Sequence, residues 1–84
     1  MEKLEKFILK ETEKAVCVEA RFFNYITEKE RFYKIWVPKS CIVIDEKGFF
    51  IKDWFLRNKI EEIFGSRFAG STSFEGLKIQ EEVA

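Results

Sequence analysis

Hydrophobic and polar residues alternate with a period of two along several stretches of the chain, a pattern typical of β-strands. The clearest stretch is 15–23. One of its faces is entirely apolar and consists of Val16, Val18, Ala20 and Phe22. The other face becomes charged at Glu19 and Arg21, so we expect burial on that face to fade along the strand.

A second strand, 32–37, ends at Pro38. Proline has no N–H to donate to a sheet, so Pro38 must lie at an edge, a bend or a bulge. The run 41–44 beyond it is almost continuously apolar and β-branched, which predicts a strand buried on both faces. We therefore expect a strand, a sharp corner and a second strand, the arrangement that closes small barrels.

Shorter elements surround these two strands. Residues 6–10 fit a strand, although the apolar spacing there also suits a helical turn. A polar turn follows at 11–14, and the polar cluster at 24–31 predicts a hairpin loop. Residues 45–48 have the pattern of a tight turn that ends in a glycine able to adopt positive φ, and 49–52 that of a short strand.

One helix is predicted, over residues 54–64. Its apolar residues recur at helical spacing and form a stripe of Leu56, Ile60, Ile63 and Phe64. Asp53 is the expected N-cap, because its carboxylate can accept hydrogen bonds from the free N–H groups of the first turn. Gly65 is expected to end the helix in the left-handed conformation.

These elements predict one domain over residues 1–64, of mainly β (α+β) class. We expect a small SH3-like or OB-like antiparallel β-barrel of five to six strands, with one helix in the C-terminal half. Residues 65–84 differ in composition. Glycine and serine are frequent in 65–76, which predicts a flexible loop or tail, and the alternation at 77–80 allows a short last strand.

The composition adds a surplus of aromatic residues. Ten Phe, two Tyr and two Trp are generous for 84 residues, so we expect some of them at the surface, in a binding face or a subunit interface. Charge is balanced, with fifteen basic and fifteen acidic residues. The balance counts against strong non-specific binding to nucleic acid without excluding it, since folding can gather charge of one sign on one face.

Cys17 and Cys41 both lie in apolar strand-like runs, so we expect two buried free thiols; a disulfide would require the two strands to be neighbours. No apolar stretch approaches the ~20 residues that span a bilayer, and the charged start of the chain lacks the pattern of a signal peptide. We therefore expect a protein of the cytoplasm, without a membrane partner.

The chain contains no histidine, which removes Ser–His and Cys–His nucleophile pairs and the usual zinc sites. No glycine-rich phosphate loop precedes the helix, and the paired carboxylates lie where solvated turn or helix charge is expected. We therefore predict a protein that is not an enzyme, with no catalytic residue, no metal and no cofactor.

Phe32, Lys34 and Trp36 share one strand face, and Lys39 lies near the bend. Aromatic and cationic side chains on one face of a small β-barrel can stack bases or nucleotides. The alternative, which the small size of the chain favours, is that Trp36 packs under the helix as part of the core.

A second candidate site is Arg67 with Phe68, within the Gly/Ser-rich segment. In a mobile loop, this pair could clamp an anionic ligand or enter a pocket of a partner. The alternative is an ordinary solvated tail, which we favour.

Three segments resemble small uncharacterised proteins of bacteriophages and prophages. Residues 12–19 have the pattern T-E-K-A-x-x-V-E, residues 36–42 the pattern W-x-P-K-S-x-I, and residues 54–56 a late W-[FL]-[LA]. The resemblance covers roughly residues 8–60, and W-x-P-K-S is its most specific part. It implies no assigned activity, cofactor or site residue. If the chain is phage-encoded, its compartment is the cytoplasm of the host.

Two classes of function fit these observations. The first is a phage or mobile-element protein that associates stoichiometrically with a host protein, for example as an anti-CRISPR-like inhibitor of a host defence factor; an assembly accessory of a phage belongs to the same class. The second is a module that binds single-stranded nucleic acid or a nucleotide through Phe32, Lys34, Trp36, Lys39 and Arg67. The aromatic surplus also makes a homodimer an expected assembly.

Overall fold

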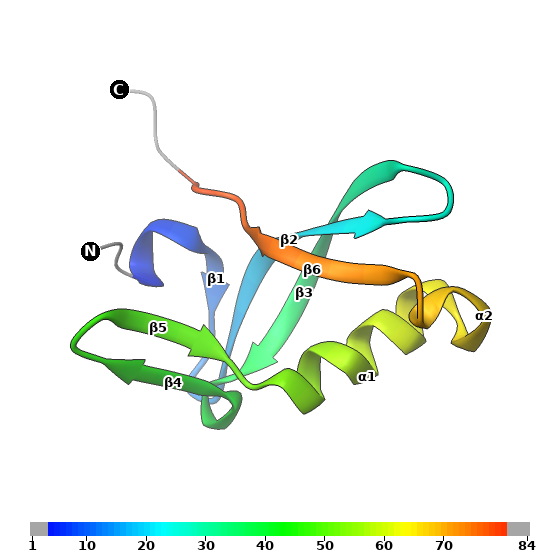
Figure 1. Cartoon of the computed structure of the whole chain (residues 1–84). Coiled ribbons are helices and arrows are strands. Elements are labelled where there is room, and N and C mark those ends of the chain that lie inside the picture. Colours follow the sequence, from blue (N-terminus) through cyan, green and yellow to red (C-terminus); the bar gives the residue numbers. More distant parts are fainter. Residues whose placement is uncertain (1–3, 81–84) are drawn as a thin grey trace.

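A long hairpin of strands β2 (Ala15–Asn24) and β3 (Lys29–Pro38) organises the fold (Figure 1). The computed structural model describes residues 4–80. Every residue of β2 pairs with one of β3 along the antiparallel ladder. Because side chains alternate along both strands, the predicted apolar face of β2 lies on one side of the hairpin, and it is buried, as expected.

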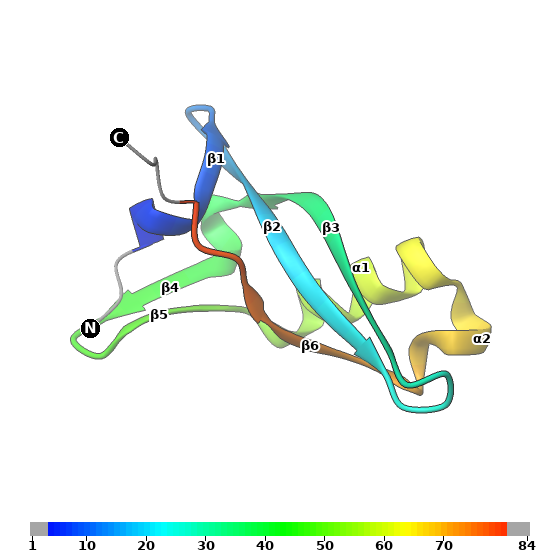
Figure 2. The same ribbon diagram turned by 90° about the horizontal axis from the view of Figure 1, so that it is seen from above.

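The other edge of β2 is shared by two strands that are far apart in the sequence. β1 (Ile8–Glu11) pairs with the first half of β2, and β6 (Thr72–Leu77) pairs with the second half (Figure 2). A second sheet consists of the hairpin β4 (Ile42–Asp45) and β5 (Gly48–Ile51). All of these pairs are antiparallel.

The strands do not close into the predicted SH3-like or OB-like barrel. Pro38 and the 3-10 helix Lys39–Cys41 turn the chain away from β3 before β4 begins. As a result, β4 pairs with β5, and within residues 4–80 the outer edge of β3 pairs with no strand. The predicted α+β class and the corner at Pro38 are therefore confirmed, and the closed barrel is wrong.

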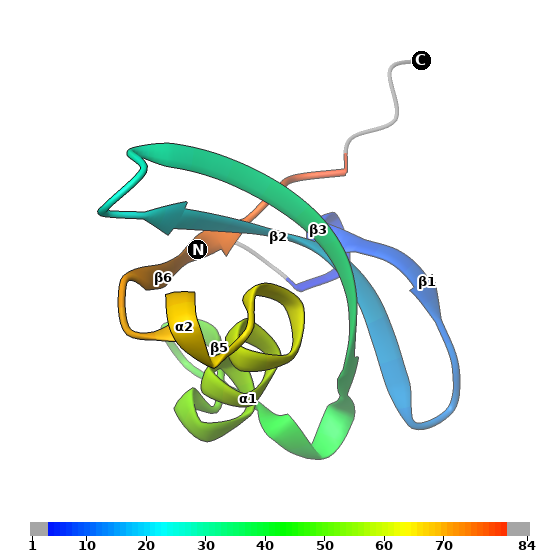
Figure 3. The same cartoon turned by 90° about the vertical axis from the view of Figure 1, so that its right-hand side faces the viewer.

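The helix α1 (Asp53–Phe64) lies across the buried face of the main sheet, and a short helix α2 (Ser66–Ala69) follows it (Figure 3). The core joins both sheets to α1, and it consists of Phe7, Val16, Val18, Ala20, Phe22, Ile35, Val37, Cys41, Ile51, Phe55, Leu56 and Ile60. Cys17 and Cys41 are free and buried, as predicted. No helix in the described part of the chain has the length and apolar character needed to cross a membrane.

The start of α1 differs from the prediction. Lys52, not Asp53, is the N-cap, and no side chain of the described residues caps this end of the helix. Asp53 lies in the first turn, where its Oδ2 is 2.7 Å from Nε of Arg57 and where a carboxylate still stabilises the helix dipole. Gly65 ends α1 with a φ of +83°, which favours glycine, but its ψ of 159° lies outside the left-handed helical region that we expected.

Two predicted boundaries near the first hairpin are also wrong. The N-terminal segment is divided between a 3-10 helix, Leu4–Phe7, and β1, so the chain uses both patterns that its apolar spacing allowed. The hairpin loop covers only residues 25–28, because 29–31 belong to β3. This second difference matters for the site, since it places two further cations on a strand.

The segment 65–76, predicted as a flexible loop or tail, contains α2 and most of β6. A last strand exists, but it begins at Thr72, before the expected 77–80. Phe74 explains its position, because its ring packs edge-on against Phe22 with the centroids 5.9 Å apart. The run 41–44 is less buried than predicted. It was expected to be buried on both faces, yet Ile44 is 71% exposed.

Candidate functional site

Phe32, Lys34 and Trp36 lie on the side of β3 that faces away from the core. Phe32 is 46% exposed and Trp36 is 44% exposed, so Trp36 is not the core residue that the alternative interpretation expected. The reason is that α1 and α2 both lie on the opposite side of the curved sheet (Figure 3). The predicted sharing of one face by these three residues is confirmed.

We call this surface the outer face; it consists of Glu19, Arg21, Phe32, Lys34, Trp36 and Lys78. The register of the hairpin places Glu19 opposite Lys34 and Arg21 opposite Phe32. Lys78 follows β6, and its Nζ lies 5.8 Å from the centroid of the Phe32 ring and 4.0 Å from Oε1 of Glu19. Aromatic, basic and acidic side chains are therefore interleaved on the outer face.

Lys39 does not join the outer face. Its Nζ donates to Oε2 of Glu11 at 2.6 Å, and its backbone N–H donates to the carbonyl of Lys14 at 2.8 Å. Both contacts connect the corner after β3 to the β1–β2 turn. We therefore assign Lys39 a structural role at this corner.

Arg67 and Phe68 lie on α2 rather than in a mobile loop. The Arg67 guanidinium is 5.7 Å from the centroid of the Phe68 ring. Phe68 also lines a pocket beside the β2–β3 hairpin, on the side of the sheet that carries the helices. The predicted site residues are thus divided among the outer face, the corner at Lys39 and helix α2.

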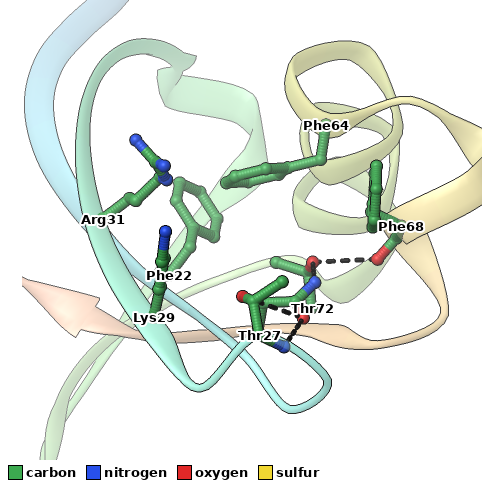
Figure 4. A pocket seen from close by; sticks show the side chains of 8 residues that line it. Phe22, Thr27, Lys29, Arg31, Phe64, Phe68 and Thr72 are labelled. Carbon is green, nitrogen blue, oxygen red and sulfur yellow. Dashed lines mark hydrogen bonds between the residues drawn. The ribbon is translucent and has the colours of Figure 1, made fainter.

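This pocket, which we call the hairpin pocket, has a volume of about 210 Å³ (Figure 4). Its lining consists of Phe22, Asn24, Thr27, Lys29, Arg31, Phe64, Phe68 and Thr72. Lys29 and Arg31 were not among the predicted site residues, because both fell in the predicted loop. The signal was present, since the period of two in β3 extends back from Tyr33 through Arg31 to Lys29.

Asn24 holds one wall of the hairpin pocket together. Its Nδ2 donates to Oγ of Ser71 and to Oγ1 of Thr72, each at 3.0 Å. Its Oδ1 accepts from the backbone N–H groups of Ile26 and Thr27, each at 2.9 Å. The side chain therefore connects the hairpin loop to the start of β6.

Neither a metal site nor a relative identifies the chemistry of this chain. Within residues 4–80, no three Cys, Asp or Glu side chains are grouped so that they could hold a metal ion. No protein-family model, curated protein or solved structure matches the chain.

Proposed function

We propose that this chain is a non-enzymatic binding protein that associates stoichiometrically with a protein partner through its outer face. The observation that supports the proposal is the exposure of Phe32 and Trp36 on the same face of one strand, with Lys34 between them. Exposed aromatic side chains on a rigid element are the residues that most often anchor protein interfaces.

The geometry of the outer face suits such an interface. Phe32 and Trp36 are four residues apart, which is about 13 Å along a strand, so both fit within the ~800 Å² that one partner buries in a typical complex. Lys34 has no carboxylate within ion-pair distance among the described residues, and it would be available to an acidic group of the partner. Glu19 and Arg21, which form ion pairs with Lys78 and Glu30, lie on the neighbouring strand β2, directly opposite Lys34 and Phe32.

The resemblance to phage and prophage proteins adds a partner class to this proposal. The partner would be a host protein in the cytoplasm, such as a defence factor that the chain inhibits by occupying a surface. Inhibition of this kind requires one copy of the chain per target and no turnover.

A second candidate function is binding of single-stranded nucleic acid or a nucleotide on the same face. It is favoured by the position of Lys78 over the ring of Phe32, since stacked bases are commonly held by such aromatic and cationic pairs. Two observations count against it: Glu19 also lies on the face, and Lys39 and Arg67 lie elsewhere.

The proposal is tested by capture from a host-cell lysate with tagged wild-type protein and with Trp36→Ala and Trp54→Ala. Trp54 is a matched control, because it is also exposed but lies on α1. We expect one protein partner in a 1:1 ratio that survives moderate salt, at least tenfold weaker binding by Trp36→Ala, and unchanged binding by Trp54→Ala.

Two outcomes would decide against a protein partner. Recovery of nucleic acid that is released as salt rises would support the second function instead. Equal capture by both variants would exclude the outer face as the contact.

We further propose that a second copy of the chain associates along the unpaired edge of β3. If two β3 strands pair antiparallel about a two-fold axis at Phe32, Glu30 of each copy lies opposite Lys34 of the other. Opposite charges at directly paired positions stabilise a sheet by roughly 0.2–1 kcal/mol per pair. Such a dimer would carry the outer faces of both copies on one side of a continuous sheet.

A further inference from the structure

We propose that the hairpin pocket binds a small amphipathic carboxylate, with an aromatic or branched aliphatic group between the phenyl rings and the carboxylate at Lys29 and Arg31. This inference does not depend on the proposed function. The hairpin pocket and the outer face lie on opposite sides of β3, because Arg31 and Phe32 are consecutive residues of one strand.

The apolar part of the site is built from three phenyl rings. Phe22 is only 1% exposed and forms the base of the pocket. The ring of Phe64 meets Phe22 edge-on, with the centroids 5.5 Å apart. Phe64 and Phe68 lie on one side of the pocket, and Lys29 and Arg31 lie on the other, with the ring of Phe22 beside them (Figure 4). The side with Phe64 and Phe68 would receive the apolar group of a ligand.

The charged part of the site has one sign only. Among residues 4–80, no Asp or Glu lines the hairpin pocket. Lys29 and Arg31 are two residues apart on the same side of β3, about 7 Å along the strand, and neither has an ion-pair partner within residues 4–80. Two neighbouring cations without a counter-charge repel each other, so an anion bound between them would relieve the repulsion.

The other polar side chains of the pocket already have partners. Asn24 and Thr27 hydrogen-bond each other, and Thr72 Oγ1 donates to the carbonyl of Phe68 at 2.8 Å. The available donors are therefore those of Lys29 and Arg31, which select an acidic ligand over a neutral one. The hydrogen bonds also hold the wall in place, which lowers the ordering cost of binding.

The volume limits the size of the ligand. About 210 Å³ lies below the ~300 Å³ at which drug-sized sites begin. One ring or branched aliphatic group with a nearby carboxylate fits this space. A free organic acid and the C-terminal hydrophobic residue of a peptide both have this chemistry.

The test is an NMR titration of the ¹⁵N-labelled full chain with 3-phenylpropionate and with its neutral isostere 3-phenylpropionamide. We expect 3-phenylpropionate to cause saturable shifts of the backbone N–H signals of residues 24–31 and 64–72. We expect 3-phenylpropionamide to bind at least tenfold more weakly. A short peptide that ends in phenylalanine, with a free or an amidated C-terminus, separates the two sources: tighter binding of the acid peptide than of 3-phenylpropionate indicates a chain terminus, and the reverse order indicates a free acid.

Two variants locate the binding. The double variant Lys29→Gln with Arg31→Gln should bind 3-phenylpropionate at least tenfold more weakly and should no longer distinguish it from the amide. Lys47→Gln, in the turn between β4 and β5, should bind as the wild type does, and it also serves as the control for general loss of positive charge. Absence of saturable shifts at millimolar ligand, equal binding of acid and amide, or unchanged binding by the double variant would overturn the proposal.

Discussion

At the scale of single residues, alternation along β2 and β3 decides which aromatic rings are buried. Phe22 points into the core, where its ring is within 6.3 Å of three other rings, those of Tyr33, Phe64 and Phe74. Phe32, which has the same side chain on the paired strand, points outward and is about half exposed. The position on the strand, and not the residue type, therefore determines the contribution of each ring to stability.

This difference gives a prediction for two matched substitutions. Phe22→Ala removes a buried ring and leaves a cavity, so we expect it to lower the free energy of unfolding by about 3–5 kcal/mol. Phe32→Ala removes a ring from the surface, and we expect a loss of less than about 1 kcal/mol. Urea unfolding followed by circular dichroism measures both values. Equal losses would show that the two rings are not on opposite faces.

At the scale of elements, the boundaries depend on backbone contacts that are remote in sequence. The N–H of Lys52 donates to the carbonyl of Cys41 at 2.8 Å, which extends the pairing that β5 makes with the preceding strand region. Lys52 therefore remains extended, with ψ of 134°, and α1 can begin only at Asp53. The local preference of aspartate for the N-cap is overridden by this contact.

The uncapped helix start predicts a stabilising substitution. Lys52 has an extended backbone and lies at the N-cap, so Lys52→Asp would supply the missing acceptor for the first-turn N–H groups and a negative charge near the helix N-terminus. We expect a gain of about 1 kcal/mol, or a rise in Tm of roughly 4–8 °C for a domain of this size. Lys52→Ala removes the same positive charge without adding an acceptor, and a thermal shift equal to that of Lys52→Asp would contradict the capping explanation.

At the scale of the whole molecule, β2 pairs with every other described strand of its sheet, and β3 is left with one edge that pairs with no strand in the described part of the chain. Long exposed edges tend to pair with another chain, and proteins often protect them with charged side chains or proline. In β3 the charges are placed symmetrically about Phe32, with Glu30 on one side and Lys34 on the other. This symmetry allows the edge to pair with a copy of itself.

The proposed dimer predicts the effect of exchanging the two charges. Light scattering after size exclusion should give twice the chain mass of 10.1 kDa at high protein concentration. Glu30→Lys alone or Lys34→Glu alone places like charges opposite each other, and each should weaken dimerisation at least tenfold. The double variant, Glu30→Lys with Lys34→Glu, should restore dimerisation, because it again places opposite charges in the paired positions. A monomeric mass across the micromolar range would rule out the proposed dimer. So would a double variant that dimerises no more tightly than either single variant.

The candidate sites could be predicted only in part. The shared face of Phe32, Lys34 and Trp36 follows from the period of two and needs no tertiary information. The exposure of that face does not follow from it, since either face of β3 could have received α1. Lys39 shows a second limit, because its partner Glu11 is separated from it by the whole length of the β2–β3 hairpin.

By itself, the sequence determined the features that depend on neighbouring residues: the apolar face of β2, the corner at Pro38, the helix before Gly65 and its apolar stripe. Only the tertiary structure decided the pairing of β6 with β2, the open edge of β3 and the hairpin pocket. The physical reason is the same for all three. Each depends on which surfaces pack against each other across the core. That packing is determined by the total apolar area buried and by the hydrogen bonds of the folded chain, and not by the local conformational preference of the residues.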